Sequence, residues 1–240
     1  MRKGKRKHFW LIMILLMCGI ILSLPYLIYK SIYFYEIRHL PDDTSPVRNP
    51  KIPETLLDIA WKEFGGIGER IMMPIHFDHY AALFLSIKPP EQSFPSSSET
   101  TTLAARLLLF RRYKHAINAA EWKRLYAAAF IWVSHHWTID EALTTILTAS
   151  YYGHGIFGIE RAAKIYFQKP VNQLEKEEMA SLVVILRCPG ACNPWCYSEN
   201  NLRQVNRLFI SLEMPPLERL PHTLTPPPEN ACIKMVSQQR

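Results

Sequence analysis

One stretch near the start of the sequence constrains the fold more than any other. Residues 9–29 form a run of 21 residues without a charged side chain. A helix of about 20 apolar residues is long enough to cross the roughly 30 Å hydrocarbon core of a bilayer. The run is preceded directly by five cations, Arg2, Lys3, Lys5, Arg6 and Lys7. The pattern predicts a transmembrane anchor over 9–29, behind a basic cytoplasmic segment over 1–8.

A cleaved signal peptide is the alternative for this segment. Its apolar region would be shorter and would end at a small-x-small cleavage site. The run ends instead in Leu24-Pro25-Tyr26-Leu27, which offers no such site, so an uncleaved anchor is favoured. Because Lys and Arg accumulate on the cytoplasmic side of a span, the N-terminus is expected in the cytoplasm and the rest of the chain outside it.

The net charge argues against a nucleic-acid partner. Lys and Arg number 28 against 21 Asp and Glu, which gives +7. Subtracting the five cations before the apolar run leaves +2 for the remaining chain. A nearly neutral domain lacks the basic surface that polyanions require, so we expect no nucleic-acid binding.

The remaining chain divides at its prolines. Residues 30–53 are predicted to be a juxtamembrane linker, with four prolines between 41 and 53, and residues 215–240, with six prolines, are predicted to be a tail. The segment between them, 54–214, has apolar residues at helical spacing. Thr138 and Glu141 have the spacing of a capping box, which predicts a helix starting at Ile139. We therefore expect one mostly α domain of about 160 residues.

From Trp132 onward the sequence resembles a known family, the peptidoglycan glycosyltransferases (glycosyltransferase family 51), membrane-anchored transglycosylases that polymerise lipid II. The resemblance is carried by Trp137–Leu143, the glycine-rich segment Tyr151–Phe167 with Lys169, then Glu178, Ala180, Pro189, Asn193-Pro194, Arg203 and Arg207.

Several expectations follow from this resemblance. It implies a lysozyme-like helical domain behind a single transmembrane helix, on the periplasmic face of a bacterial cytoplasmic membrane. Lipid II or nascent glycan would be the ligand, other cell-wall synthesis proteins possible partners, and a divalent cation a possible cofactor. It also implies that Glu160 and Glu178 belong to the scaffold; we expect Glu178 to cap or pair helices.

The catalytic motifs of the family are degenerate in this chain. The family's general base is the glutamate of a Glu-Asp-x-x-Phe motif, and no Glu-Asp pair occurs here. Glu63 and Glu69 are the nearby carboxylates and hence the candidate bases. In the next motif, two glutamines and a lysine are replaced by Thr101, Thr102 and Ala105.

A third family motif places a glutamate three residues after a lysine. Lys123 matches the lysine, but Tyr126 stands at the glutamate position. A phenol with a pKa near 10 is no substitute for a carboxylate, and losing a general base slows a reaction by roughly 10²–10⁴-fold. Three interpretations stay open: an active glycosyltransferase with relocated groups, a non-catalytic glycan-binding or scaffold protein that recruits cell-wall enzymes, and a structural envelope factor.

Arg106, Arg112 and Lys123 concentrate positive charge across the second and third motifs. They are either a clamp for pyrophosphate, because guanidinium groups bind phosphate oxygens in pairs, or a solvated helix face at the membrane surface. Arg106, Arg112 and Lys123 are therefore candidate substrate-binding residues.

The cysteines of the C-terminal half are Cys188, Cys192, Cys196 and Cys232. Outside the cytoplasm, disulfides are expected, and four cysteines allow three pairings. A bridge within 188–196 and another that fastens the tail through Cys232 are favoured; a four-cysteine zinc site is the alternative. We predict no metal site, and expect the histidines at 76, 79, 135 and 136 to be ordinary polar side chains.

Overall fold

The computed structural model describes residues 2–49, 52–75, 95–113, 118–229 and 231–232, with side chains for all of these except 2–11, 21–22, 25, 29 and 112. Within these ranges the chain is helical and contains no strand. One isolated antiparallel bridge joins Tyr151 to Phe157. The mostly α domain predicted from the sequence is confirmed.

The helices are named in chain order. They are α1 (Arg2–Ile37), α2 (Glu54–Glu63), α4 (Ser98–Arg112), α5 (Ala119–His136), α6 (Ile139–Ala149), α7 (Ile159–Phe167), η2 (Val171–Gln173), α8 (Lys176–Val183), η3 (Val184–Leu186) and α9 (Ser198–Ser211).

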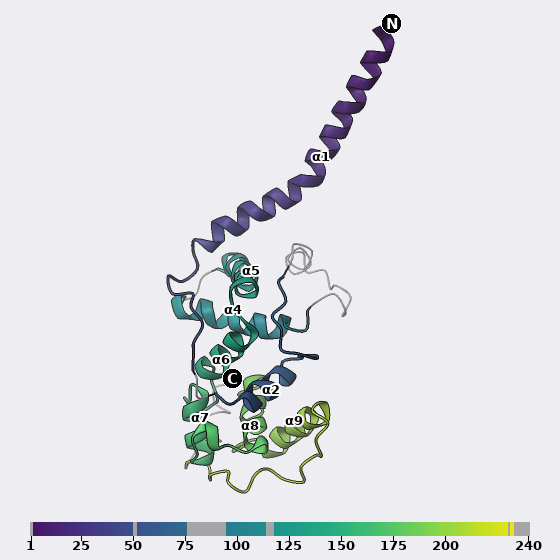
Figure 1. Cartoon of the computed structure of the whole chain (residues 1–240). Helices are drawn as coiled ribbons and strands as arrows, with labels where there is room; N and C mark the ends of the chain where they lie inside the picture. Colours follow the sequence, from purple (N-terminus) through teal and green to yellow (C-terminus); the bar gives the residue numbers. More distant parts are fainter. Residues whose placement is uncertain (1, 50–51, 76–94, 114–117, 230, 233–240) are drawn as a thin grey trace.

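Helix α1 extends away from the other helices and meets the domain only near its C-terminal end (Figure 1). It includes the uncharged run and continues to Ile37, into the segment predicted to be a linker. No proline or glycine interrupts the chain between Pro25 and Pro41, and Glu36, 3% exposed, pairs at 2.7 Å with Arg124 of α5. Among the described residues, no helix combines the length and apolarity needed to cross a membrane. The predicted transmembrane span is therefore not confirmed.

Two helices begin with reciprocal caps. The Thr138 hydroxyl accepts from the Glu141 amide, and the Glu141 carboxylate accepts from the Thr138 amide at 2.9 Å, so α6 begins at Ile139 as predicted. Helix α8 has the same arrangement: the fully buried Glu178 carboxylate accepts from the Glu175 amide and from Lys169 Nζ, both at 2.8 Å. The capping role predicted for Glu178 is confirmed.

The core lies where α4 packs on α5 and α6 and where α2 packs on α8. Its largest fully buried side chains include aromatic residues from several elements: Trp61, Phe64, Phe130, Tyr152, Tyr166 and Phe209. Buried tyrosines need partners for their hydroxyls. Tyr152 donates to the carbonyl of Leu147 at 3.0 Å, and Tyr166 donates to the carbonyl of Tyr152 at 2.9 Å. The glycine-rich segment is thus largely core.

The described residues of the proline-rich segment after α9 are hydrogen-bonded to the domain. Its Thr225 amide donates to the carbonyl of Tyr166 at 2.8 Å, and the Trp195 indole donates to the Thr225 carbonyl at 2.7 Å. The Thr223 hydroxyl donates to Glu178. The described residues of the predicted tail therefore form a strap across α7 and α8.

Two disulfides close the C-terminal half. Cys188 pairs with Cys192, and Cys196 pairs with Cys232 across a sequence separation of 36 residues. This is the pairing that the sequence favoured among the three possible ones.

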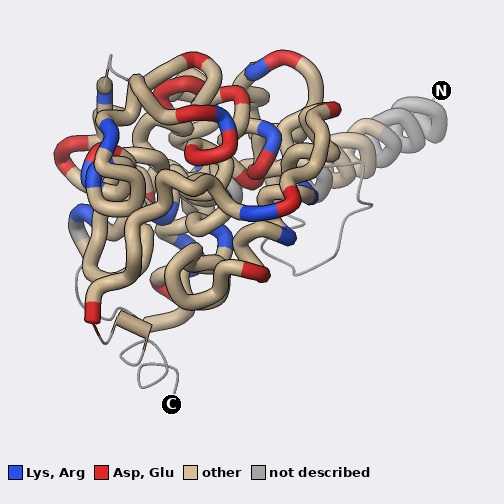
Figure 2. The backbone as a smooth tube through the Cα atoms, turned by 90° about the horizontal axis from the view of Figure 1, so that it is seen from below, with Lys and Arg blue, Asp and Glu red and all other residues tan. Residues whose placement is uncertain are grey.

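Acidic and basic positions are interspersed over the described domain (Figure 2). The picture agrees with the small net charge calculated once the N-terminal cations are set aside.

Candidate active site

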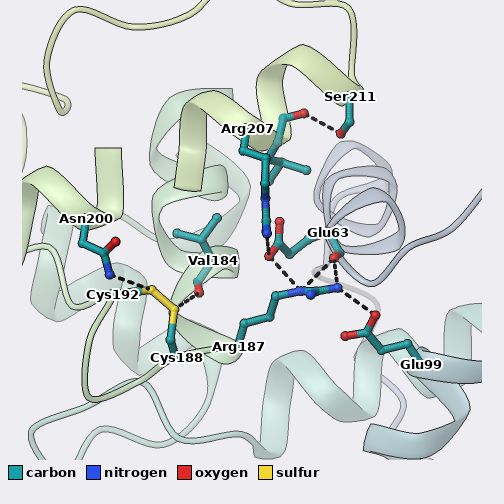
Figure 3. A network of polar contacts seen from close by, with 10 residues as sticks. Glu63, Glu99, Val184, Arg187, Cys188, Cys192, Asn200, Arg207 and Ser211 are labelled. Carbon is teal, nitrogen blue, oxygen red and sulfur yellow. Dashed lines mark hydrogen bonds and ion pairs between the residues drawn. A yellow bond between two sulfur atoms is a disulfide. The ribbon is translucent and has the colours of Figure 1, made fainter. Parts of the chain in front are cut away.

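Glu63, the first candidate base, lies at the C-terminal end of α2 and is only 4% exposed. Its Oε1 lies 2.8 Å from Arg207 Nη2 of α9 and 3.0 Å from Arg187 Nε, just after η3 (Figure 3). The carboxylate therefore faces two guanidinium groups and not an open surface.

Arg187 joins further parts of the fold to this carboxylate. Its Nε and Nη2 donate to the backbone carbonyl of Glu63 at 3.0 and 2.7 Å, and Nη2 also lies 2.7 Å from Oε2 of Glu99 in the first turn of α4 (Figure 3). Two carboxylates and two arginines thus form one network that connects α2, α4, α9 and the segment after η3. We call Glu63, Glu99, Arg187 and Arg207 the Glu63 network.

The electrostatics of Glu63 reflect its burial. Desolvation raises the pKa of its carboxyl, although Arg207 and Arg187 act in the opposite direction. A raised pKa alone would suit a general base, but such a base must lie within hydrogen-bond reach of the proton it removes. Because Glu63 is enclosed and already paired, its position is that of a structural ionic group.

Glu69, the second candidate base, is exposed in the segment that follows α2. The next residue, Arg70, fixes this segment: its side chain pairs with Asp140 of α6 at 2.9 Å and with Glu54 and Asp58 of α2. The segment is anchored through Arg70, and Glu69 is exposed on it. The structure does not bring the two candidate bases together.

A cleft of about 290 Å³ opens beside α4. Side chains at helical spacing on α4 make one wall, and α6 and the segment around Cys188 make the others. Its lining consists of Leu103, Arg106, Leu107, Phe110, Ile146, Ser150, Tyr151, Leu186, Arg187 and Pro189. The walls are mostly apolar and carry two guanidinium groups; among the described residues that line them, none is Asp or Glu.

The structure assembles the predicted basic clamp only in part. Arg106 lines the cleft, whereas Lys123 is exposed on α5 and is not among the residues of its lining. The side chain of Arg112 lies outside the described part of the chain. Arg187 takes the second basic position, and the sequence analysis missed it. Its signal was available: Arg187 is the one charged residue between the apolar run Leu182–Leu186 and Cys188.

Two degenerate motif positions meet beside Arg106. The side chains of Tyr126 and Thr102 hydrogen-bond to each other close to the Arg106 guanidinium. Burial raises the pKa of Tyr126, so its hydroxyl is neutral at physiological pH. Hydroxyl groups therefore stand here where the family resemblance would place a carboxylate and an amide, and they supply neither a base nor a strong metal ligand.

No group of three or more His, Cys, Asp or Glu side chains with metal-binding geometry occurs within the described residues. His135 and His136 lie at the end of α5, and the His136 ring stacks on Trp132 with 4.2 Å between centroids. Both are exposed. The predicted histidines at 76 and 79 lie outside the described residues.

The described chain is a helical domain, and its cleft combines guanidinium groups with apolar walls. Sequence comparison gives the family, because a family model described as "Transglycosylase" matches residues 97–213. Residues 97–213, just under half of the chain, thus match the transglycosylase family, glycosyltransferase family 51. The match runs from the start of α4 to just past α9, so it extends the resemblance that the sequence showed from Trp132 onward and leaves α1 and α2 outside.

Individual relatives are similar to this chain over shorter segments than the family model. Penicillin-binding protein 1A of Mycobacterium tuberculosis is 40% identical over 62 residues, 26% of this chain and 8% of its own length. Penicillin-binding protein 2D of Bacillus subtilis is 38% identical over 76 residues, 31% of this chain and 11% of its own. The biosynthetic peptidoglycan transglycosylase of Escherichia coli is 36% identical over 67 residues, 28% of each chain. The chain thus matches less than a third of the length of each of these relatives.

Proposed function

We propose that this protein binds lipid II or a nascent peptidoglycan strand in the cleft beside α4 without polymerising it. The observation that carries this proposal is the enclosure of Glu63, whose carboxylate is 4% exposed and held by two arginines. The family membership and the name of the Escherichia coli relative support a ligand from peptidoglycan synthesis.

The chemistry of the cleft suits a lipid-linked anion. Arg106 and Arg187 can donate paired hydrogen bonds to phosphate oxygens. The apolar side chains between them, such as Leu103, Leu107 and Phe110, can contact hydrocarbon or sugar-ring faces. Arg187 is already shared with Glu63 and Glu99, so Arg106 should contribute most of the new charge interaction.

The lack of catalysis follows from the carboxylates. Glu63 is occupied in its network, Glu69 is exposed on the segment held by Arg70, and Tyr126 is a neutral phenol beside Arg106. Transfer of a sugar requires a base that can take the proton of the acceptor hydroxyl. None of these groups combines basicity with a position in the cleft.

We also propose that the domain lies outside the cytoplasm, anchored by α1. Support comes from the sequence: a 21-residue uncharged run behind five cations. Protease added to spheroplasts should cleave the domain if this is correct, and should leave it intact if the domain is cytoplasmic. Fractionation of the cells checks the association with the membrane in the same experiment.

The test of function uses labelled lipid II and the purified full chain. We expect saturable binding without formation of glycan polymer. Arg106→Ala should weaken binding about 10- to 100-fold, since a hydrogen bond to a charged group contributes about 1.5–3 kcal/mol. Lys123→Ala, which removes a cation outside the cleft lining, is the matched control and should bind like the wild type.

Three results would overturn the proposal. Polymer made by the wild type and lost in Glu63→Gln or Glu69→Gln would establish catalysis and identify the base. Binding that is unaffected by Arg106→Ala would show that the cleft is not the binding site. Absence of any glycan binding would favour the alternative, a scaffold that recruits cell-wall enzymes.

A further inference from the structure

The disulfide between Cys196 and Cys232 has a histidine beside it. His154, in the loop between α6 and α7, places Nε2 3.7 Å from Sγ of Cys196. Its ring also lies against Trp195, with 5.4 Å between centroids. Disulfide sulfurs do not titrate, so this contact has no acid–base role while the bond is intact. It gains one when the bond opens.

The imidazole is held in place by buried groups. The Asn193 side chain, fully buried, hydrogen-bonds to it and also donates to the Tyr166 hydroxyl. His154 itself has a left-handed backbone, with φ of 51°. A non-glycine residue adopts this conformation rarely. The ring is therefore fixed toward Cys196 by its backbone and by its neighbours.

The other disulfide has different surroundings. The Cys188 sulfur faces the carbonyl of Val184 at 3.7 Å, and the Cys192 sulfur accepts from the Asn200 side-chain amide at 3.5 Å. Cys192 is only 1% exposed. These neutral partners do not exchange protons, so the two disulfides of one chain provide a built-in comparison.

We propose that Cys196–Cys232 is a redox-active site that undergoes reversible exchange with a dithiol, with His154 stabilising Cys196 as the leaving thiolate. A thiol beside a protonated histidine ionises at a lower pH than the usual value of about 8.5. Burial lowers the pKa of His154 and acts against this protonation, whereas the hydrogen bond from Asn193 favours it. Exchange is faster when the departing thiol has a lower pKa. The incoming thiolate should therefore attack Cys232 and expel Cys196.

The exchange balances with a dithiol reductant. Its thiolate forms a bond to Sγ of Cys232 as the Cys232–Cys196 bond breaks, and the electron pair leaves on Cys196 next to the His154 ring. The second thiol of the reductant then attacks the mixed disulfide and releases Cys232, which takes a proton from water. The reductant becomes a disulfide and the protein gains two thiols. The reverse reaction restores the covalent clamp on the strap.

The first test needs no substitution in the site. The full chain carrying Cys18→Ser, which removes the exposed free cysteine of α1, is treated with limiting glutathione and quenched with an alkylating agent. Peptide mass spectrometry then locates the adduct. We expect glutathione on Cys232 and an alkylated thiol on Cys196. Adducts mainly on Cys196, or equally on both, would overturn the assignment.

The second test measures rates of opening by dithiothreitol. His154→Asn keeps a residue that tolerates the left-handed backbone but removes the imidazole. It should slow opening of Cys196–Cys232 severalfold, because the departing Cys196 thiol would then have a higher pKa and leave more slowly. Opening of Cys188–Cys192 in the same molecules should keep its rate, which also reports that the fold is intact. An unchanged rate at Cys196–Cys232 would refute the role of His154.

Discussion

Replacing Glu178 with alanine should lower the free energy of unfolding by about 3 kcal/mol. The fully buried carboxylate accepts hydrogen bonds from the Glu175 amide, Lys169 and the Thr223 hydroxyl. Losing the cap leaves a helix-terminal amide without its acceptor, which lowers the free energy of unfolding by about 1 kcal/mol. Hydrogen bonds to a charged group contribute about 1.5–3 kcal/mol each. Lys169 is 26% exposed and recovers part of its loss in water, so the total stays well below the sum.

Urea denaturation followed by circular dichroism measures this loss directly, and a thermal scan should show a midpoint about 6–12 °C lower for a domain of this size. Glu160→Ala is the matched control. Glu160 was assigned to the same scaffold by the family resemblance, but it is exposed on α7, and its removal should change stability by less than about 0.5 kcal/mol.

A loss below about 1 kcal/mol for Glu178→Ala would refute the assignment of this carboxylate as a cap and cross-link. Loss of glycan binding with unchanged stability would place it in the site instead. Equal effects of the Glu178 and Glu160 substitutions would show that burial does not separate the two positions.

Three other outcomes follow from the described contacts. Gly66→Ala should destabilise the domain by about 1–3 kcal/mol in a thermal scan, because its Cβ would lie 2.1 Å from the Trp61 ring. Cys232→Ser should cost about 3–4 kcal/mol in urea denaturation, since the Cys196–Cys232 bond closes a loop of 36 residues; an unchanged midpoint would contradict this. Burial raises the pKa of Glu63, so the folded state holds its proton more tightly and this carboxyl favours folding below its usual pKa of 4.5. That contribution fades as the pH rises through the raised value, and Glu63→Gln should remove this component from stability curves measured across the acidic range.

Local signals in the sequence were sufficient for part of the fold. The capping residues Thr138 and Glu141 are three positions apart, and their side chains interact with each other's backbone whatever the rest of the chain does. The start of α6 could therefore be predicted to the residue. The role of Glu178 at the start of α8 was anticipated differently, from the family resemblance.

The Glu63 network could not be predicted in this way. Glu63 meets Arg187 across 124 residues of sequence and Arg207 across 144. Neither spacing leaves a local pattern, because the partners come together only when α2 packs against α8 and α9. Glu63 could be selected from the sequence only as a carboxylate near the missing motif, while its enclosure depended on tertiary packing.

The strap has a consequence for the order in which the protein can be completed. The carboxylate that caps α8 is also bound by Thr223, 45 residues later in the sequence. During synthesis at about 5–20 residues per second, those residues follow after roughly 2–9 s. For that interval α8 has its local cap but not the strap that covers it. Helix α8 is therefore secured by a residue that is made 45 positions after its own cap.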